Sequence, residues 1–344
     1  MQSKPSSYIN GFDWVRAFMS VAVVTWHLHT FGKSMLYTEK FARFRINLGD
    51  LVNFHLVPVS VPAFLLISCL FIARNPTDWP RLRHRLWRLT LLVIFWTIML
   101  SIWMNGYGGL LKMVPKSPLD LMVTILSANG EFYYFFISLM MCLLMAFASA
   151  RLSNFLNWIL LALSLTLMFF LPLIAMATNQ TILIAYWSPL NFLPYPFAAI
   201  LIFRYQDHLL ANRRSLIFSV LGLLALSAVF AWYEWTHNIQ AVFQAEGPAL
   251  PLLMRVSLVF LGAAIVVIAM WPWRTAPAVI RFMSKYSLAL FVLHAFFRPI
   301  VLQNTPALGL PDPLMRLFQL LAVVLLCYLT ALILTAFIKE DLVR

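Results

Sequence analysis

The chain has 344 residues, of which 62% are hydrophobic and only 11% are charged, and its mean hydropathy is +0.85. These values exclude a soluble domain built around one apolar core and are typical of a protein that crosses a membrane several times. The formal net charge of +13 lies in short segments between apolar runs. It therefore indicates membrane topology and contact with lipid head groups, and not nucleic acid binding.

The hydropathy pattern predicts an all-α fold, a polytopic bundle of about ten transmembrane helices that forms a single domain over residues 1–344. We expect no appended soluble domain, and the short apolar segment 119–128 is expected in the membrane interface. With the amino terminus inside, most of the 25 Lys and Arg residues fall on the cytoplasmic side, which predicts that both termini are cytoplasmic. The expected spans are 12–32, 53–74, 88–105, 131–150, 156–177, 181–203, 215–236, 250–271, 284–303 and 314–338.

The stretch 13–27 of the first expected span carries three ionisable side chains, which are unfavourable at membrane depth and are functional candidates for that reason. Arg16 and His27 are eleven residues apart, so both lie on one helix face, about 16 Å apart along the axis. Asp13 precedes Arg16 by three residues and can pair with it at the helix start. An arginine near a helix end can also extend to the head groups, and a histidine can be a satisfied core residue.

The second candidate is the basic segment 74–88, RNPTDWPRLRHRLWR, just before the third expected span. Membrane topology alone would produce such a segment on the cytoplasmic side. The functional alternative is a phosphate site, because arginine binds phosphate through two N–H groups and keeps its charge at any cellular pH. Arg85 and Arg88 are one helical turn apart and are suitably spaced to hold a diphosphate from the cytoplasm.

Two other ionisable groups lie in or near later spans. Glu131 opens the fourth span beside several aromatic residues, either as an interfacial carboxylate or as a group that faces the same cavity as the first-span histidine. His294 has apolar neighbours on both sides and is followed one turn later by Arg298, which makes a second intramembrane ionisable pair. The proline-rich segment 189–197 breaks the sixth span, and residues 232–235 (WYEW) are typical of an interfacial aromatic belt.

Several familiar catalytic and metal-binding patterns are missing from the sequence. It has no phosphate-binding P-loop, no G-x-G-x-x-G, no H-E-x-x-H and no G-x-S-x-G. Cys69, Cys142 and Cys327 are scattered through apolar runs without metal-ligand spacing, and we interpret them as packing residues. We therefore expect no metal ion and no serine nucleophile of the hydrolase type.

The first-span pattern D-x-x-R-A-x9-H, formed by Asp13, Arg16, Ala17 and His27, resembles the signature of the membrane acyltransferase 3 family. Four further segments resemble parts of the same family in the same order, and the likeness covers about residues 13–300. Cys69 stands where glycine is usual, and the proline that often follows the basic segment is missing. The segments are VPAFLLISCLFIAR (61–74), RLRHRLWRL (81–89), EFYYFFISLMMCLL (131–144) and SKYSLALFVLHAFF (284–297).

This resemblance implies a stand-alone integral-membrane O-acyltransferase in a bacterial inner membrane. Such an enzyme moves an acyl group, usually acetyl from acetyl-CoA, onto a hydroxyl of a glycan such as a cell-surface polysaccharide or a lipid-linked sugar. We expect no metal, and we expect contacts with membrane lipid, acyl-CoA and the hydroxyl acceptor. The expected roles are catalysis for His27, Arg16 and Asp13, acyl-CoA binding for Arg16, Arg85 and Arg88, and acceptor binding or proton relay for Glu131 and His294.

Two other classes of function remain open at this point. A proton-coupled transporter would also suit ten spans, a proline-broken helix and intramembrane His and Arg, although the chain shows no broken segments in two matching halves. A structural subunit of a polysaccharide assembly machine would tolerate an apolar replacement of the Asp13–Arg16–His27 face. Turnover of acetyl-CoA by the purified protein distinguishes the three classes.

Overall fold

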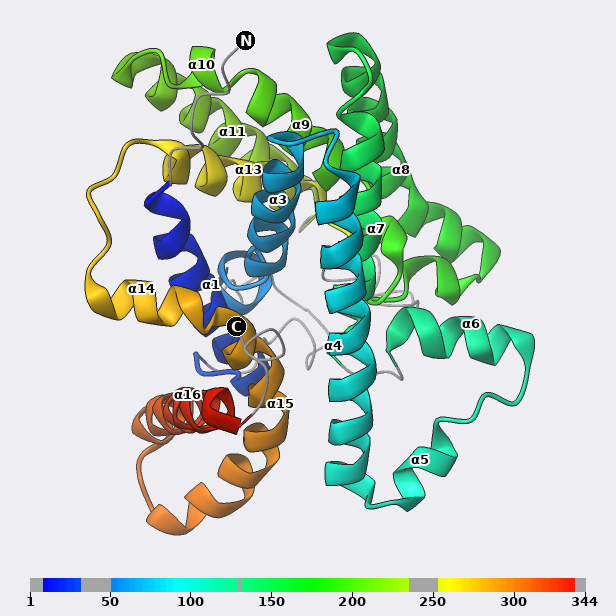
Figure 1. The fold of residues 1–344 in the computed structure, drawn as a ribbon, viewed down its shortest axis with the longest axis vertical. Helices are drawn as coiled ribbons and strands as arrows, with labels where there is room; N and C mark the ends of the chain where they lie inside the picture. The colour runs from blue at the N-terminus through cyan, green and yellow to red at the C-terminus, as the bar shows by residue number, and fades with distance from the viewer. Residues whose placement is uncertain (1–8, 32–50, 129–131, 235–252, 338–344) are drawn as a thin grey trace, which may run out of the picture.

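The computed structural model describes residues 9–31, 51–128, 132–234 and 253–337, and the regular secondary structure among them is helical, with no strand (Figure 1). The predicted all-α fold is therefore confirmed for the described part of the chain. The longer helices are α1 (Gly11–Leu28), α3 (Ser60–Ala73), α4 (Trp79–Asn105), α7 (Tyr134–Ser149), α8 (Asn154–Thr178), α9 (Pro194–Arg204), α11 (Arg213–Tyr233), α13 (Val256–Met270), α15 (Ser287–Asn304) and α16 (Asp312–Phe337). The shorter ones are η2 (Val52–Leu56), α5 (Gly108–Lys112), α6 (Pro118–Ser127), η3 (Thr181–Ile184), η4 (Pro189–Phe192), α10 (Gln206–Leu209), α14 (Ala278–Lys285) and η6 (Thr305–Leu308).

Five helices in the described ranges are long and apolar enough to cross a membrane, namely α4, α8, α11, α15 and α16. Four shorter apolar helices of 10–17 residues accompany them, namely α3, α6, α7 and α13. Helix α1 has 18 residues, but Asp13, Arg16 and His27 lower its hydropathy. The chain is thus a multi-pass membrane protein.

Helix α4 begins well before the expected third span at 88–105. The side chain of Asp78 accepts a hydrogen bond from the backbone N–H of Arg81 at 3.0 Å, and a proline occupies the first turn. Both features favour a helix start. The basic segment is therefore mostly helical, and the spacing of Arg81, Arg85 and Arg88 places all three on one helix face.

The expected sixth span at 181–203 is not one helix. It consists of η3, η4 and α9, because the prolines in this stretch lack the N–H groups that a continuous helix needs. The side-chain amide of Asn191 donates to the carbonyls of Ala185 and Tyr186, both at 3.0 Å. This amide replaces part of the missing backbone hydrogen bonding and keeps the broken segment ordered inside the bundle.

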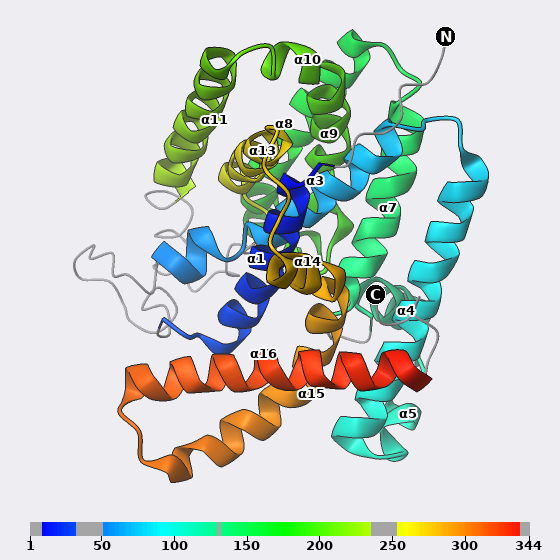
Figure 2. The ribbon, with the colours of Figure 1, turned by 60° about the vertical axis from the view of Figure 1, so that its left-hand side comes forward.

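Helix α1 is the centre of the packing and contacts α3, α13, α14, α15 and α16. Its first residue approaches α13 so closely that a Cβ on Gly11 would lie 2.0 Å from the carbonyl oxygen of Ala269. A Cβ on Gly262 of α13 would lie 2.9 Å from a side-chain carbon of Pro62 in α3. Small residues at these crossings let the backbones approach, as is usual between membrane helices. Figure 2 shows α16 crossing near the carboxyl end of α1.

Candidate functional site

A cavity of about 350 Å³ opens between α1, α3, α4, α7, α14 and α15. Five cationic side chains and one carboxylate line it, so its walls carry an excess of positive charge. The apolar part of its lining consists of leucine and phenylalanine side chains. We name it the basic cavity, and its polar lining residues are Asp13, Arg16, Ser68, Arg85, Arg88, Arg281, Ser284, Lys285 and Ser287.

The basic cavity brings together the three arginines that the sequence singled out for phosphate binding. Arg16 comes from the first turns of α1, and Arg85 and Arg88 come from the second and third turns of α4. Arg85 interacts electrostatically with Arg16, Arg88 and Arg81, all of the same sign. Such a group of like charges repels itself, and an anion bound between its members would relieve the repulsion.

The carboxylate of Asp13 is almost fully buried, at 5% exposure. The hydroxyl of Ser284 donates to its Oδ1 at 2.7 Å. This hydrogen bond ties the start of α1 to α14, and it fixes the carboxylate beside Arg16 in the wall of the cavity. The sequence suggested Arg16 as the partner of Asp13 but did not reveal Ser284.

Arg281 and Lys285 were not expected at the site. They lie four residues apart on α14, whose apolar residues face the other way, and both line the basic cavity. The four-residue spacing of two cations next to Ser284 was visible in the sequence. What was not visible was that α14 packs against α1 and so turns this face toward the arginines of α4.

A smaller cavity of about 160 Å³ adjoins the basic cavity and shares Asp13 and Arg16 with it. Its other polar lining residues are Arg74, Asn75 and Arg81. We name it the side cavity. Together the two cavities hold seven cationic side chains around one carboxylate.

The two candidate histidines meet deeper in the bundle, outside the lining of the basic cavity and of the side cavity. The imidazole rings of His27 and His294 stack with their centroids 5.0 Å apart, and the ring of Phe132 lies 4.1 Å from His27 and 5.3 Å from His294. Arg298 is close enough to interact electrostatically with both imidazoles. His27 of the first expected span therefore lies together with the pair His294 and Arg298 of the ninth.

The hydrogen bonding of His294 favours one tautomer. Its side chain has 0% exposure, and Nδ1 lies 3.3 Å from the carbonyl oxygen of Leu290. An N–H at Nδ1 that donates to this carbonyl leaves Nε2 as the acceptor of the neutral ring. Within the described residues Nε2 has no hydrogen-bond partner, which leaves it able to accept a proton or a hydrogen bond from a hydroxyl.

An aromatic layer separates the basic cavity from the histidine pair. Phe135 and Phe291 line the cavity, their ring centroids are 5.1 Å apart, and Phe291 lies 6.1 Å from the ring of His294. Along α1 the distance from Arg16 to His27 is about 16 Å. The rings of Phe135 and Phe291 thus lie next to the arginines on one side, and Phe291 lies next to His294 on the other. Glu131, the remaining predicted site residue, lies outside the described residues.

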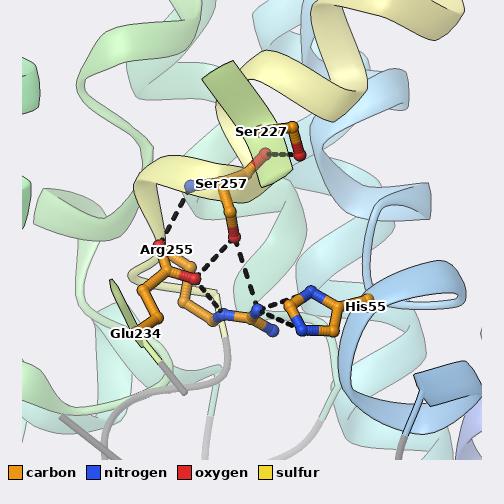
Figure 3. Close-up of polar contacts among 5 residues, drawn as sticks. All are labelled: His55, Ser227, Glu234, Arg255 and Ser257. Atoms are coloured by element: carbon orange, nitrogen blue, oxygen red, sulfur yellow. Dashed lines mark hydrogen bonds and ion pairs between the residues drawn. The ribbon is translucent and has the colours of Figure 1, made fainter. Parts of the chain in front are cut away.

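A second polar cluster lies at the other end of α13 (Figure 3). Arg255 and Glu234 form an ion pair with Nε and Oε2 2.9 Å apart, and they are only 1% and 3% exposed. The hydroxyl of Ser257 donates to the same carboxylate oxygen at 2.6 Å, and its backbone N–H donates to Oε1 at 3.0 Å. The guanidinium contacts Nδ1 of His55 at 2.7 Å, and the hydroxyl of Ser227 donates to the carbonyl of Ser257 at 2.9 Å.

This cluster, which we name the ionic staple (His55, Ser227, Glu234, Arg255 and Ser257), corrects the expected interfacial belt at 232–235. Trp232 is exposed as that belt requires, but Glu234 is buried and paired. The staple links the end of α11 and the start of α13 to η2. Its carboxylate accepts from three donors, so we assign it a structural role and no proton transfer.

The described ranges hold no group of three or more His, Cys, Asp or Glu side chains that could bind a metal ion. A family model described as an acyltransferase domain matches residues 9–336, nearly the whole chain. The resemblance drawn from the sequence is thereby confirmed. No curated protein and no solved structure matches the chain.

Proposed function

Because this chain belongs to the acyltransferase family whose model spans it, we propose that it is an integral-membrane O-acetyltransferase. It moves acetyl from acetyl-CoA onto a hydroxyl of a glycan, such as a cell-surface polysaccharide or a lipid-linked sugar, in a bacterial inner membrane. The observation that carries the proposal is the basic cavity, where α1, α4 and α14 place five cations around one carboxylate. This charge fits a donor with several phosphate groups.

The proposed topology has ten spans and both termini in the cytoplasm. In this topology the start of α1, the end of α3 and the start of α4 are all cytoplasmic, and these ends surround the two cavities. Acyl-CoA is made in the cytoplasm, so the donor would reach the cavities directly. Arg16, Arg85 and Arg88 would hold its diphosphate through paired N–H groups, with Arg281 and Lys285 adding charge at the entrance.

The thioester end of the donor would extend past the aromatic layer to the histidine pair. There the acceptor oxygen attacks the thioester carbonyl, the new C–O bond forms, and the C–S bond breaks. His27 takes the proton of the hydroxyl as a general base, and this proton ends on the sulfur of the leaving CoA. In the alternative route His27 accepts the acetyl group itself and then passes it to the hydroxyl. Asp13 would position Arg16, and His294 and Glu131 would bind the acceptor or relay the proton.

The experiment that tests this function is acetyl-CoA turnover by the purified protein in lipid nanodiscs, with hydrolysis or transfer to added glycan as the readout. We expect turnover by the wild type. If the wild type neither binds nor consumes acetyl-CoA, the enzymatic proposal is wrong and the transporter alternative gains support.

The same assay tests the basic cavity. Replacing Arg88 with glutamine should raise the KM for acetyl-CoA about ten-fold with little change in kcat, because a charged hydrogen bond contributes about 1.5–3 kcal/mol and this one is made equally before and during the reaction. The matched control is Arg214→Gln, since Arg214 is an exposed residue at the start of α11 that lines neither cavity. An unchanged KM in the Arg88 variant would contradict the placement of the donor phosphates.

A further inference from the structure

We propose that the side cavity binds the 3′-phosphate of the CoA nucleotide, and that this subsite selects acyl-CoA over acyl groups carried on protein-bound phosphopantetheine. The inference rests on the proposed function and assigns a role to Arg74 and Arg81 that the acyl-transfer chemistry does not require. CoA carries a diphosphate at the 5′ position of its ribose and a separate phosphate monoester at the 3′ position. Phosphopantetheine on a carrier protein has only one phosphodiester.

The arrangement of the two cavities matches this chemistry. Both phosphate groups of CoA are attached to one ribose, so their binding sites must be adjacent. The basic cavity and the side cavity share Asp13 and Arg16 in their common wall. Arg16 can therefore contact both phosphate groups, while Arg85 and Arg88 serve one cavity only and Arg74 and Arg81 serve the other.

The side chains of the side cavity are arranged for an anion. The guanidinium carbons of Arg16 and Arg74 lie 5.4 and 5.5 Å from the centre of the Phe71 ring. One aromatic ring thus holds two like charges in place, and cation–π attraction offsets part of their repulsion. Neither Arg74 nor Arg81 forms an ion pair with a carboxylate of the described residues. Three guanidinium groups against one carboxylate leave the cavity positive.

The backbone around the side cavity positions Arg81. Asp78 caps the start of α4 by accepting from the backbone N–H of Arg81 at 3.0 Å, so this carboxylate is engaged in the cap. With the Asn75 amide oxygen turned toward Arg81, the guanidinium donates to it at 3.0 Å. Arg81 is exposed while Arg74 is half-buried, which places one cation at the mouth of the cavity and one at its wall. A phosphate monoester can enter from the aqueous side between them.

The test compares the binding of CoA and of dephospho-CoA, which lacks only the 3′-phosphate, in phosphatidylcholine nanodiscs. The wild type should bind CoA about ten-fold more tightly than dephospho-CoA. Arg81→Gln and Arg74→Gln should each weaken CoA binding several-fold and leave dephospho-CoA binding unchanged. The ratio of the dissociation constants of dephospho-CoA and CoA should therefore fall toward one. Arg88→Gln should weaken both ligands by a similar factor. The matched control is Arg83→Gln, because Arg83 is exposed on the same helix and lines neither cavity.

Equal binding of the two ligands by the wild type would overturn the subsite and leave the proposed function standing. Equal weakening of both ligands by Arg81→Gln and Arg74→Gln would also overturn it, because these residues would then act on the donor as a whole. If phosphatidylglycerol in place of phosphatidylcholine removes the preference for CoA, the side cavity binds a lipid phosphate and the assignment is wrong. A wild type that binds neither ligand would overturn the proposed function together with the subsite.

Discussion

Replacement of His27 by alanine should reduce acetyl transfer by about 10²–10⁴-fold, because a positioned general base contributes a factor of this size. Donor binding should change little, since His27 lies outside the lining of the basic cavity and about 16 Å along α1 from Arg16. The measurement is kcat with acetyl-CoA in nanodiscs, together with CoA binding as a check of folding. Transfer at the wild-type rate would remove His27 from the mechanism.

A matched control for this variant is His84→Ala. His84 is exposed on α4 and lines neither the basic nor the side cavity. We expect it to keep both the turnover and the CoA binding of the wild type. A loss in the His84 variant equal to that in the His27 variant would show that the assay reports general damage and not the chemistry of the histidine pair.

The same variant separates the two chemical routes. If His27 accepts the acetyl group, labelled acetyl-CoA without acceptor should transfer label to the wild-type protein and not to His27→Ala. If His27 is a general base, the protein should stay unlabelled until acceptor is added. His294 stacks on His27 and would suit either route, because its Nε2 can accept a hydrogen bond from the hydroxyl or relay its proton.

Helical periodicity was sufficient for the parts of the site that lie on one helix. It placed Arg16 and His27 on one face of α1 and Arg85 and Arg88 one turn apart on α4, and the structure has both helices. Whether these residues carry out the predicted roles stays a prediction. The cap at Asp78 also explains why α4 begins early, and this signal was present in the sequence as an Asp followed shortly by a proline.

Contacts between helices could not be predicted in this way. Periodicity gives the direction of a side chain but does not identify the helix that it faces. The hydrogen bond between Ser284 and Asp13 was therefore missed, and so was the presence of Arg281 and Lys285 in the basic cavity. The crossing of α1 and α13 depends on Gly11, whose importance appears only when the facing carbonyl is known. In an apolar sequence almost every face of a helix can pack against another helix. The hydropathy pattern is therefore compatible with many arrangements of the helices.

The hydropathy pattern also did not distinguish a carboxylate in the membrane interface from a buried carboxylate. Glu234 follows two aromatic residues near the end of a span, which is the usual setting of an interfacial carboxylate. Its actual partner, Arg255, lies 21 residues further along the chain, at the start of α13. Buried charges in a membrane protein pair with one another, but the sequence did not identify which arginine would be the partner.

Removal of one member of this pair should strongly destabilise the protein. Arg255→Met leaves the Glu234 carboxylate buried without its cation, and breaking such a pair costs about 3–5 kcal/mol. The double variant Glu234→Leu with Arg255→Met should recover most of this loss, because apolar side chains of similar size remove both charges together. The measurement is the free energy of unfolding in detergent micelles for the two variants and the wild type.

The exposed ion pair of the described chain supplies the control for the staple. Oδ2 of Asp312 and Nη2 of Arg316 lie 2.6 Å apart on α16, but the two side chains are 78% and 28% exposed. Asp312→Asn should therefore change the free energy of unfolding by less than about 1 kcal/mol. If Arg255→Met lowered the free energy of unfolding as little as Asp312→Asn, the buried charges would contribute little to stability.

Because α13 has 15 residues and spans about 22 Å between the staple and the start of α1, the double variant should also keep CoA binding at the basic cavity.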